Sequence, residues 1–503
     1  MEIHPARELT ENLFSIKTVK FLTALWSLDA IGITDKNLSE SREEELALQQ
    51  FYATLKYIEP EKRYEVAWPT RELYPKVPQN YGLAKAVLVN LIRRYATKKI
   101  YLRTCDEIFK KQLDDGIIER APDETSRERT HYLPFHFVER EGKSTAIRVV
   151  YNGSAKTAKN QLSLNENLYK GVNLLNDMLG VLLRFGLKPI VLLGDMEKAF
   201  YQITLLPEHR DYVRFLWVED YEDTENYEFI TYRFRRIPFG VISSPFILAA
   251  TVLYHLNKYD STAAKQIKQD LYTDNIITTF NTENEALEFH NEALPIFDQA
   301  SMPLRQWKSN SSFVHNSIDP EIRDDNKITT VLGLQWDVDK DMLTINIPPP
   351  ISQKQQVTMI QVLQISSQVY DPLSWFAPVT IRIRMLLQTL HAQSYTWETK
   401  LNESENIEWH EIYRDLQQIK NFNIRRNIDS TLENVQSRQY HVFTDASKKA
   451  YAATVYLRIQ TTTETKIYLL MAESRVTPLT EENRLTIQRL ELMAALLGKR
   501  ILT

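Results

Sequence analysis

Hydrophobic and polar positions change their spacing along the chain, and each change predicts a different kind of element. Apolar residues recur at helical spacing over residues 84–96, and a second helix is predicted over residues 106–113. From Tyr132 the spacing becomes that of a strand, and alternation on both sides of a turn at 141–143 predicts a hairpin that ends at Tyr151. The apolar face of the first helix consists of Ala84, Leu88, Leu91, Ile92 and Tyr95.

Strands and helices alternate through the middle of the chain, and turn residues separate them. Asp274-Asn275 lies between two β-prone runs in residues 270–280, so we predict a tight hairpin with these two residues in its turn. Pro245 predicts the start of a long helix, because a proline is tolerated in the first turn. The other predicted elements are helices over 174–187 and 283–300, strands over 211–218 and 227–234, and a hairpin of strands 330–337 and 342–347.

A proline run at 348–350 marks a boundary, and helical patterns follow it over 353–369 and 381–391 and up to about residue 426. The last part returns to strands. A strand, a turn and a second strand are predicted over 441–458, a third strand over 466–474, and an amphipathic helix over 485–502.

Two carboxylates stand next to apolar strand patterns. Asp195 follows the run Ile190 to Leu193 and Gly194, where the strand should end, and a carboxylate is costly to bury there unless something positive meets it. A helix N-cap would explain Asp195, and ordinary turn chemistry would explain Asp274. If neighbouring strands instead bring the two together, their oxygens suit Mg²⁺. Two such ions, ~3.5–4 Å apart, would serve an in-line phosphoryl displacement.

Composition narrows the classes of function. The 503 residues allow several domains, and 43% hydrophobic and 25% charged residues are ordinary values for a soluble globular protein. With only 12 glycines and neither G-x-G-x-x-G nor G-x-x-x-x-G-K-[ST], we expect no Rossmann or P-loop nucleotide site. The net charge of −4 shows no global basic field, although a local basic groove can coexist with it.

Cellular context follows from a few further features. The single cysteine, Cys105, excludes an internal disulfide and a cysteine-based zinc site, and it fits a reducing compartment. The first residues lack the apolar core of a secretory signal peptide. The longest apolar region, 178–193, carries two basic residues and falls short of a ~20-residue span. We therefore expect a soluble protein without membrane contact.

Three stretches give the carboxylates a context: DMEKAF from Asp195, IPFGVISSP from Ile237 and LYTDN from Leu271. In this order and spacing they resemble motifs A, B and C of retroelement reverse transcriptases. The flanking stretches RVVYNGSAKT, LNENLYKGVNLL, VRFLW, LRQW, LGLQWD and DPLSWFAPVTI sharpen the likeness, and together they resemble the polymerase of a BEL/Pao-type LTR retrotransposon. The resemblance covers nearly the whole chain, and several motifs in sequence are more specific than any one.

The resemblance implies an α+β fold of the right-hand polymerase type, with fingers, a palm built on an antiparallel sheet, and a helical thumb and connection. An incomplete RNase H-like α/β segment would follow. The expected parts are a helical lead-in similar to the linker after a retroelement protease (1–78), fingers (79–170), palm (171–347), thumb and connection (348–436) and a truncated RNase H-like domain (437–503).

The resemblance also implies roles for single residues. Asp195 and Asp274 would hold two Mg²⁺ ions, or Mn²⁺, with help from the backbone carbonyl of Met196. Phe200 would be the steric gate that rejects a ribose 2′-hydroxyl and so selects dNTPs. The other implied contacts are Phe239 and Gly240 of the motif B turn against the nucleotide, Arg148 with Lys143 or Arg140 on the triphosphate, and Leu332, Gly333, Leu334, Gln335 and Trp336 in the primer-grip hairpin.

The chain departs from the family pattern at one position that matters. Motif C usually has two aspartates, whereas here Asn275 takes the second place, which keeps an oxygen but loses a negative charge. Asp445 and Glu491 match the first two catalytic carboxylates of RNase H, and without the later acidic elements we expect only a remnant. A strand-end aspartate and a helix-surface glutamate describe these two equally well.

Three hypotheses of function follow. The first is an RNA-directed DNA polymerase, a reverse transcriptase, that adds dNTPs to a primer 3′-hydroxyl, with an RNA template and a DNA primer/template as partners. The second is a catalytically degenerate retroelement relic that binds nucleic acid without polymerising. The third is a metal-dependent nuclease that acts through Asp445 and Glu491. The resemblance implies a cytoplasmic location within a retroelement particle, with the nucleus as an alternative.

Overall fold

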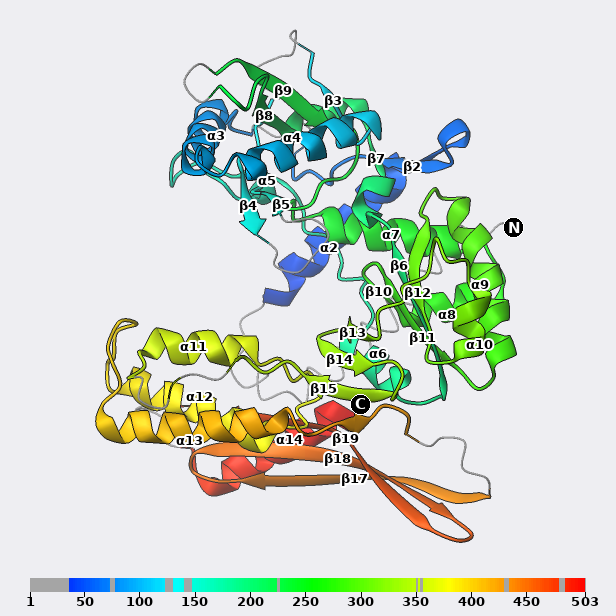
Figure 1. Cartoon of the computed structure of the whole chain (residues 1–503), viewed down its shortest axis with the longest axis vertical. Helices are drawn as coiled ribbons and strands as arrows, with labels where there is room; N and C mark the ends of the chain where they lie inside the picture. The colour runs from blue at the N-terminus through cyan, green and yellow to red at the C-terminus, as the bar shows by residue number, and fades with distance from the viewer. Residues whose placement is uncertain are drawn as a thin grey trace. The chain divides into compact units, whose positions relative to one another are not determined.

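The computed structural model describes residues 36–72, 77–122, 130–139, 147–223, 227–349, 352, 356–428, 434–478 and 485–502 (Figure 1). The chain forms two compact units and passes between them several times. The first unit comprises residues 1–175, 196–265 and 293–303, and the second comprises residues 176–195, 266–292 and 304–503. Both units combine helices with mostly antiparallel sheets, so the fold is mixed α/β.

Helices of the first unit follow from the apolar spacing. In α3 (Tyr81–Tyr95) the five residues of the predicted apolar face are buried, which confirms that helix. The next helix, α4 (Lys99–Asp114), begins earlier than predicted. Its buried face includes Leu102 and Phe109, and this apolar face extends the helix toward its N-terminus.

The predicted lead-in is helical only in part. After α2 (Lys36–Thr54) the chain forms strands β1 (Lys56–Ile58) and β2 (Arg63–Val66), which pair antiparallel. Pro60 and the left-handed Lys62, with φ 49°, reverse the chain between the two strands. Residues 1–35 of the predicted lead-in lie outside the described residues.

Two sheets of the first unit come from predicted strands. The hairpin is confirmed, because β4 (Phe135–Glu139) pairs with β5 (Ile147–Tyr151) in antiparallel register. Residues 211–213 are not part of a strand as predicted but end the 3-10 helix η5 (Pro207–Val213), which Pro207 starts. The other sheet is β3 (Ile118–Arg120), β9 (Phe229–Phe234) and β8 (Arg214–Val218), and the remaining elements are α5 (Leu164–Asn167), η4 (Ala199–Gln202), β7 (Thr204–Leu205) and α7 (Ser244–Leu256).

The central sheet of the second unit has the strand order β10-β11-β6-β12. Strand β6 (Ile190–Met196) pairs antiparallel with β11 (Asn275–Phe280), so Asp195 lies within the strand and not after its end as predicted. The ladder continues through Asp195 because Asn275 pairs with it. The helices in this part of the chain are α6 (Met178–Phe185), α8 (Thr262–Asp270), α9 (Glu283–Asp298) and α10 (Ser312–Ser317). Helices α8 and α10 and strand β12 (Leu304–Lys308) were not predicted.

Two turns of the second unit differ from their predictions. The hairpin of β10 (Leu271–Tyr272) and β11 turns at Thr273-Asp274, with Thr273 at φ 58°, and Asn275 already belongs to the strand. The predicted strand 330–337 is two strands, joined by Leu332 and Gly333 at φ 45° and 94°. Positive φ at both central residues is typical of the tightest hairpin turns. The strands of this second sheet are β13 (Ile328–Val331), β14 (Leu334–Asp337), β15 (Met342–Ile345) and β16 (Ile424–Arg425).

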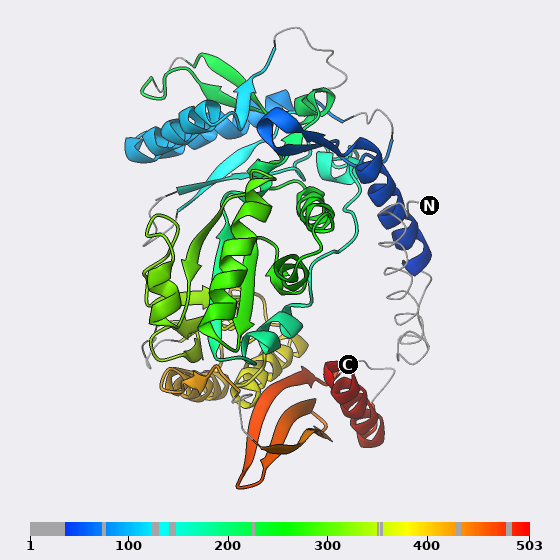
Figure 2. The same cartoon turned by 90° about the vertical axis from the view of Figure 1, so that its right-hand side faces the viewer.

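The last part of the second unit has the predicted order of elements. Helices α11 (Met359–Gln368), α12 (Ala377–Ala392) and α13 (Glu403–Ile419) precede a sheet of three long antiparallel strands, and α14 packs on that sheet (Figure 2). The buried side chains of the helices, β13–β15 and β6 form one hydrophobic cluster. The final elements are β17 (Val435–Ala446), β18 (Ala450–Thr461), β19 (Thr465–Val476) and α14 (Ile487–Leu502).

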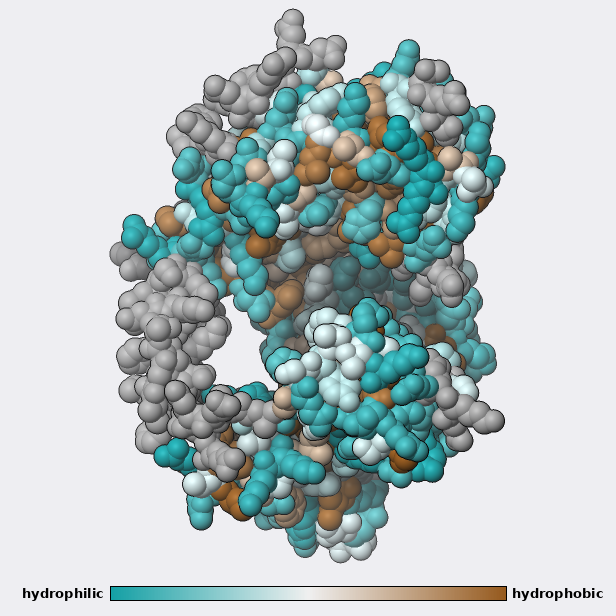
Figure 3. All heavy atoms as spheres, turned by 90° about the vertical axis from the view of Figure 1, so that its left-hand side faces the viewer, coloured by the Kyte–Doolittle hydropathy of each residue, from teal (hydrophilic) through white to brown (hydrophobic). Residues whose placement is uncertain are grey.

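The surface carries mostly hydrophilic side chains on the face shown in Figure 3, and hydrophobic ones occur there in small groups. No helix in the described part of the chain combines the length and the apolar character that a membrane crossing requires.

Candidate functional site

Asp195 and Asn275 face each other on neighbouring strands. Asn275 is the direct antiparallel partner of Asp195, and the side chains of such a pair lie on one face of the sheet. Asp274 precedes Asn275 in the turn, and Asn275 Nδ2 donates a hydrogen bond to Asp274 Oδ1 at 2.9 Å. The structure therefore brings Asp195, Asp274 and Asn275 to one end of the β6–β11 pair.

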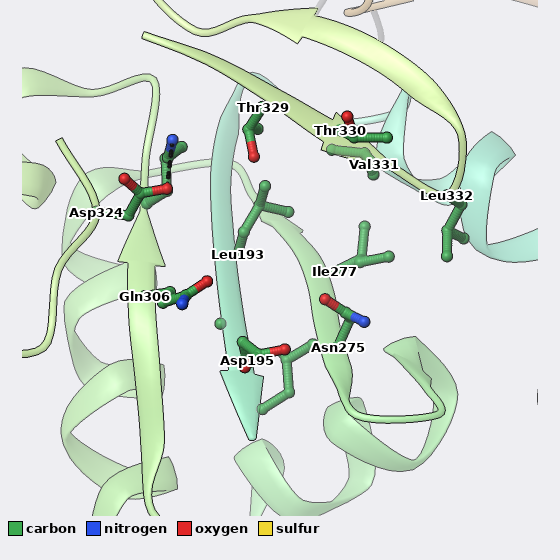
Figure 4. A pocket seen from close by; sticks show the side chains of 13 residues that line it. Leu193, Asp195, Asn275, Ile277, Gln306, Asp324, Thr329, Thr330, Val331 and Leu332 are labelled. Atoms are coloured by element: carbon green, nitrogen blue, oxygen red, sulfur yellow. Dashed lines mark ion pairs between the residues drawn. The ribbon is translucent and has the colours of Figure 1, made fainter. Parts of the chain in front are cut away.

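A cavity of about 230 Å³ lies beside these residues, within the second unit. Figure 4 shows Asp195, Asn275 and Gln306 on three neighbouring strands at one side of the cavity, and the β13 residues Thr329 and Thr330 across from them. The exposed Gln306 has φ 53°, an unfavourable backbone for a residue with a side chain. Such strain costs about 1–3 kcal/mol and persists only where the surroundings determine the conformation.

A buried lysine lines the same cavity. The side chain of Lys308 is 2% exposed, and its Nζ lies 2.8 Å from Asp324 Oδ2. It also donates a hydrogen bond to the backbone carbonyl of Asn326. Burial pushes the pKa of Asp324 upward, but hydrogen bonds from Lys308 and Asn326 outweigh burial and hold that pKa below its ordinary value. The lysine charge is thus compensated within the cavity wall.

The residues predicted for the primer grip do not share one surface. Leu334 and Trp336 are fully buried and belong to the hydrophobic cluster. Leu332 and Gly333 form the β13–β14 turn. Gln335 is half-buried and alternates with the two buried residues of β14. Only the turn and Gln335 can therefore touch a ligand directly.

A second group of predicted residues gathers in the first unit around the ring of Phe239. The guanidinium of Arg148 lies 5.0 Å from the centroid of that ring. The rings of Phe200 and Tyr201 meet it edge-on, with centroid distances of 4.6 and 5.5 Å. Burial raises the pKa of Tyr201 to about 12, so its hydroxyl is protonated at neutral pH. The cluster contains the predicted triphosphate contact, the predicted sugar gate and the motif B turn.

Gly240 sets how closely the motif B turn approaches strand β5. Its φ is 89°, and a Cβ atom there would lie 2.2 Å from the carbonyl oxygen of Tyr151, the last residue of β5. The N–H of Gly153 also donates to Gly240 O at 3.4 Å. Because Arg148 is on the same strand, this contact fixes the spacing between the turn and Arg148.

Replacing Gly240 by alanine is expected to destabilise the first unit by about 3 kcal/mol, because the new methyl group meets backbone at an unfavourable φ. Urea unfolding followed by tryptophan fluorescence measures the change. The matched control is Gly82→Ala in α3, where nothing lies within 4 Å of an added Cβ, and this variant should gain about 0.5–1 kcal/mol. Equal stability of the two variants would contradict the close contact at Gly240.

The remaining predicted polymerase residues are placed only in part. Met196 is buried and ends β6 directly after Asp195. Arg140 and Lys143, the other predicted triphosphate contacts, lie outside the described residues. The three residues at the β6–β11 end belong to the second unit and the Phe239 cluster to the first.

The two RNase H-like carboxylates lie on opposite faces of the β17–β19 sheet. A Cβ atom on Gly498 of α14 would touch the side chains of Val442 and Thr444, so these two point toward the helix. Asp445 follows Thr444 in an unbroken ladder, and strand alternation turns it to the other face. Glu491 is on α14 itself. Across the described residues, no group of three or more His, Cys, Asp or Glu side chains is placed to hold a metal.

Gln306 and Lys308 beside the cavity and Tyr201 in the Phe239 cluster were not predicted from the sequence. Gln306 and Lys308 lie in the stretch LRQWKSN, which contributed only to the resemblance. Nothing local marks Lys308 as buried, because its partner Asp324 comes from a separate loop. Tyr201 follows Phe200 directly, and its aromatic neighbours are distant in the chain.

Comparisons with known proteins bear on the fold. Residues 358–503 match the family model of the Pao retrotransposon-like RNaseH-like domain, a range that includes α11–α13 and begins before the predicted start at 437. No curated protein shows a significant match to the chain. The structure of the foamy viral protease-reverse transcriptase in complex with dsDNA matches with a TM-score of 0.50 and 16% identity, over 80% of this chain and 72% of that chain.

Two further foamy viral structures match with slightly lower TM-scores. The protease-reverse transcriptase in complex with an RNA/DNA hybrid has a TM-score of 0.49 and 17% identity, over 80% of this chain and 46% of that chain. The dRH form in complex with ds DNA has a TM-score of 0.48 and 15% identity, over 78% of this chain and 58% of that chain. This chain thus spans about half the length of these two. In fold the chain is similar to a viral protease-reverse transcriptase, and from residue 358 its sequence is similar to the RNaseH-like domain of Pao retrotransposons.

Proposed function

We propose that this chain is the RNA-directed DNA polymerase of a BEL/Pao-type retroelement and transfers nucleotides from dNTPs to a primer 3′-hydroxyl. The observation that carries the proposal is the pairing of β6 with β11, which sets Asp195 opposite Asn275 and beside Asp274. The fold comparison and the RNaseH-like match support it. The partners in this proposal are an RNA template and a DNA primer, and the foamy viral neighbours have RNA/DNA hybrid or dsDNA bound.

The donor atoms at the β6–β11 end fit Mg²⁺. Carboxylate oxygens of Asp195 and Asp274 are hard ligands, and Mg²⁺ typically binds one or two carboxylates together with substrate phosphates. A site of two protein carboxylates is consistent with the lack of a three-residue acidic cluster among the described residues. When bound, the ions supply charge neutralisation at the phosphates and activation of the attacking hydroxyl. Asp195 and Asp274 would hold them in place.

The Phe239 cluster of the first unit suits the nucleotide. The Arg148 guanidinium stacks on the Phe239 ring, which orients its planar fork for bidentate contact with phosphate oxygens. Phe200 packs edge-on against the same Phe239 ring. A ring fixed in this way can exclude a 2′-hydroxyl by contact, which is the selection of dNTP over NTP in our proposal.

Primer extension on poly(rA)/oligo(dT) with Mg²⁺ or Mn²⁺ tests the proposal, and Asn275→Asp sharpens the test. We expect wild type to incorporate dTTP and Asn275→Asp to raise kcat/KM about tenfold at limiting Mg²⁺. The reason is the attraction between the added carboxylate and the metal ion, since two unit charges 4 Å apart near a protein surface interact by ~4 kcal/mol. A third of this energy corresponds to a change of about tenfold in an equilibrium constant. The added carboxylate would stand opposite Asp195, so without metal the variant should unfold at lower temperature and regain stability with Mg²⁺.

Absence of dTTP incorporation by wild type with either metal would falsify the polymerase function for this chain. A matched control is Asn281→Asp, which adds the same charge at an exposed position just after β11. This variant should leave both the Mg²⁺ requirement and the metal-dependent stability unchanged.

The second candidate function is nucleic-acid binding without polymerisation. The observation that favours it is the Asn275 amide, which donates to Asp274 and so occupies an oxygen that a metal would otherwise use. Under this alternative, Asn275→Asp restores activity to a silent wild type. A nuclease that uses Asp445 and Glu491 has no comparable support, because these carboxylates lie on opposite faces of their sheet.

A further inference from the structure

The stretch LNENLYKGVNLL contributed to the resemblance without a role of its own. In the structure its first residues form α5, and Ser163 caps this helix in a capping box with Glu166. Lys156 Nζ lies 2.6 Å from Glu166 Oε1. Hydrogen bonds from Lys156 and Ser163 lower the pKa of Glu166 to about 2, so the box stays ionised and intact over the neutral range. The short helix is thereby held in one place.

Asn165 connects this helix to the motif B turn. Its Oδ1 accepts a hydrogen bond from the backbone N–H of Ile242 at 2.9 Å. Its Nδ2 donates to Ser154 Oγ at 2.8 Å, and its own N–H donates to Gly153 O at 2.9 Å. One side chain therefore joins α5, the loop after β5 and the residues that follow Gly240.

The bond to Ile242 orders the turn more than it stabilises the unit. Ile242 is 37% exposed, so water could replace the Asn165 oxygen at little cost in folding free energy. Burial and separate contacts hold the helix that follows: Ser243 Oγ donates to Tyr169 O at 2.7 Å, and Gly171 leaves room for the Phe246 ring. Within the turn, Ser244 Oγ donates to Pro238 O at 2.7 Å and Ser244 N–H to Val241 O at 3.1 Å. The bond from Ile242 to Asn165 ties the backbone between Gly240 and α7 to α5.

We propose that Asn165 is a positioning residue for nucleotide selection, an inference that rests on the proposed polymerase function. By holding the N–H of Ile242, Asn165 keeps the turn against β5 and sets the Phe239 ring against Arg148 and Phe200. The space left for the sugar of the incoming nucleotide depends on the place of that ring. Loss of the bond lets the turn move, and the gate then discriminates less well.

The test compares incorporation of dTTP and rUTP on poly(rA)/oligo(dT) by wild type, Asn165→Ala and Asn167→Ala. Asn167 is the matched control, because it lies on the same helix and donates to Ser163 O at 2.8 Å without touching the turn. We expect the dTTP preference to fall about tenfold in Asn165→Ala, the effect of one lost hydrogen bond, and to stay within about twofold in Asn167→Ala. A preference is a ratio, so a smaller folded fraction does not change it.

Two further variants keep the test decisive. Asn165→Asp retains an acceptor for Ile242 and should keep most of the preference. Asn165→Ser is too short to reach Ile242 and replaces the alanine variant if that one does not fold. An unchanged preference in both Asn165→Ala and Asn165→Ser overturns the proposal.

Amide hydrogen exchange separates this inference from the polymerase function, because it needs no activity. Peptides that cover residues 238–244 should exchange about tenfold faster in Asn165→Ala than in Asn167→Ala. A wild type without primer extension rejects the polymerase function and leaves this measurement standing. Equal exchange in the two variants rejects the positioning role, whatever the activity.

Discussion

Replacement of Asp195 by alanine is expected to abolish primer extension, with dTTP incorporation falling about a thousandfold or more. Metal-held charge stabilisation contributes several kcal/mol to such reactions, and each 1.36 kcal/mol corresponds to about tenfold in rate. Asp195 is half-buried on β6 and faces Asn275, so no other carboxylate of that strand can take its place. Steady-state primer extension with Mg²⁺ and with Mn²⁺ measures the loss.

Asp260→Ala is the control for this prediction, because the Asp260 side chain is 91% exposed in a loop of the other unit. It should retain wild-type incorporation. Asp195→Asn separates charge from shape, since it keeps the size of the side chain, and it should be nearly as inactive as the alanine variant. Incorporation above about a tenth of wild type in Asp195→Ala would mean that Asp195 is not a metal ligand.

Arg426→Ala should destabilise the second unit by about 3–5 kcal/mol, the range for breaking a buried charge pair. The Arg426 side chain is 0% exposed, and its Nε and Nη2 donate to the Asp341 carboxylate at 2.6 and 2.8 Å. The other N–H groups donate to the carbonyl oxygens of Phe185, Lys188 and Pro189. All five guanidinium N–H groups thus donate a hydrogen bond. Alanine would remove these five bonds from Asp341 and the three carbonyl oxygens.

Urea unfolding followed by tryptophan fluorescence measures this effect, since the buried Trp336 also donates to Asp341. The neighbouring Arg425 is exposed, so Arg425→Ala provides a matched control within about 0.5 kcal/mol of wild type. In Arg426→Ala, a second change of Asp341 to asparagine should recover part of the loss, because it removes the unpaired charge. A loss below 1 kcal/mol in Arg426→Ala would refute the role given to these five bonds.

The spacing of apolar residues predicted those helices and strands that bury a regularly spaced set of apolar side chains. The buried face of α3 and the β4–β5 hairpin follow from spacing alone, because each buries a regular set of apolar residues. The turn at Leu332-Gly333 could not be found in this way, since leucine rarely adopts the positive φ that the structure requires there. Strand β12 was missed for a similar reason: Arg305 and Gln306 interrupt its apolar pattern, and only the pairing with β6 makes it a strand.

The candidate site was predictable in residue type but not in arrangement. The motifs around Asp195 and Asp274 pointed to a shared metal site, and the strand register places Asn275 opposite Asp195. Which strand residues face a helix depends on how the two elements pack. The sequence therefore did not predict that Asp445 and Glu491 lie on opposite faces of the sheet. Buried polar partners such as Lys308 and Asp324 depend on contacts between separate loops, and hydrophobic patterns carry no signal for them.

Arg426 has a consequence for the order in which the chain can be completed on the ribosome. The carbonyl groups that it binds, at Phe185, Lys188 and Pro189, precede it by 241, 238 and 237 residues. At a synthesis rate of ~5–20 residues per second, these groups wait about 10–50 s for Arg426. Until Arg426 emerges, water binds the carbonyl groups of Phe185 and Lys188 before β6. Strand β11, the sheet partner of β6, emerges before Arg426 does. Asn310 binds Pro189 O and the N–H of Val191 earlier in synthesis. The contacts of Arg426 with Phe185 O and Lys188 O complete the start of the strand that carries Asp195 only late in translation.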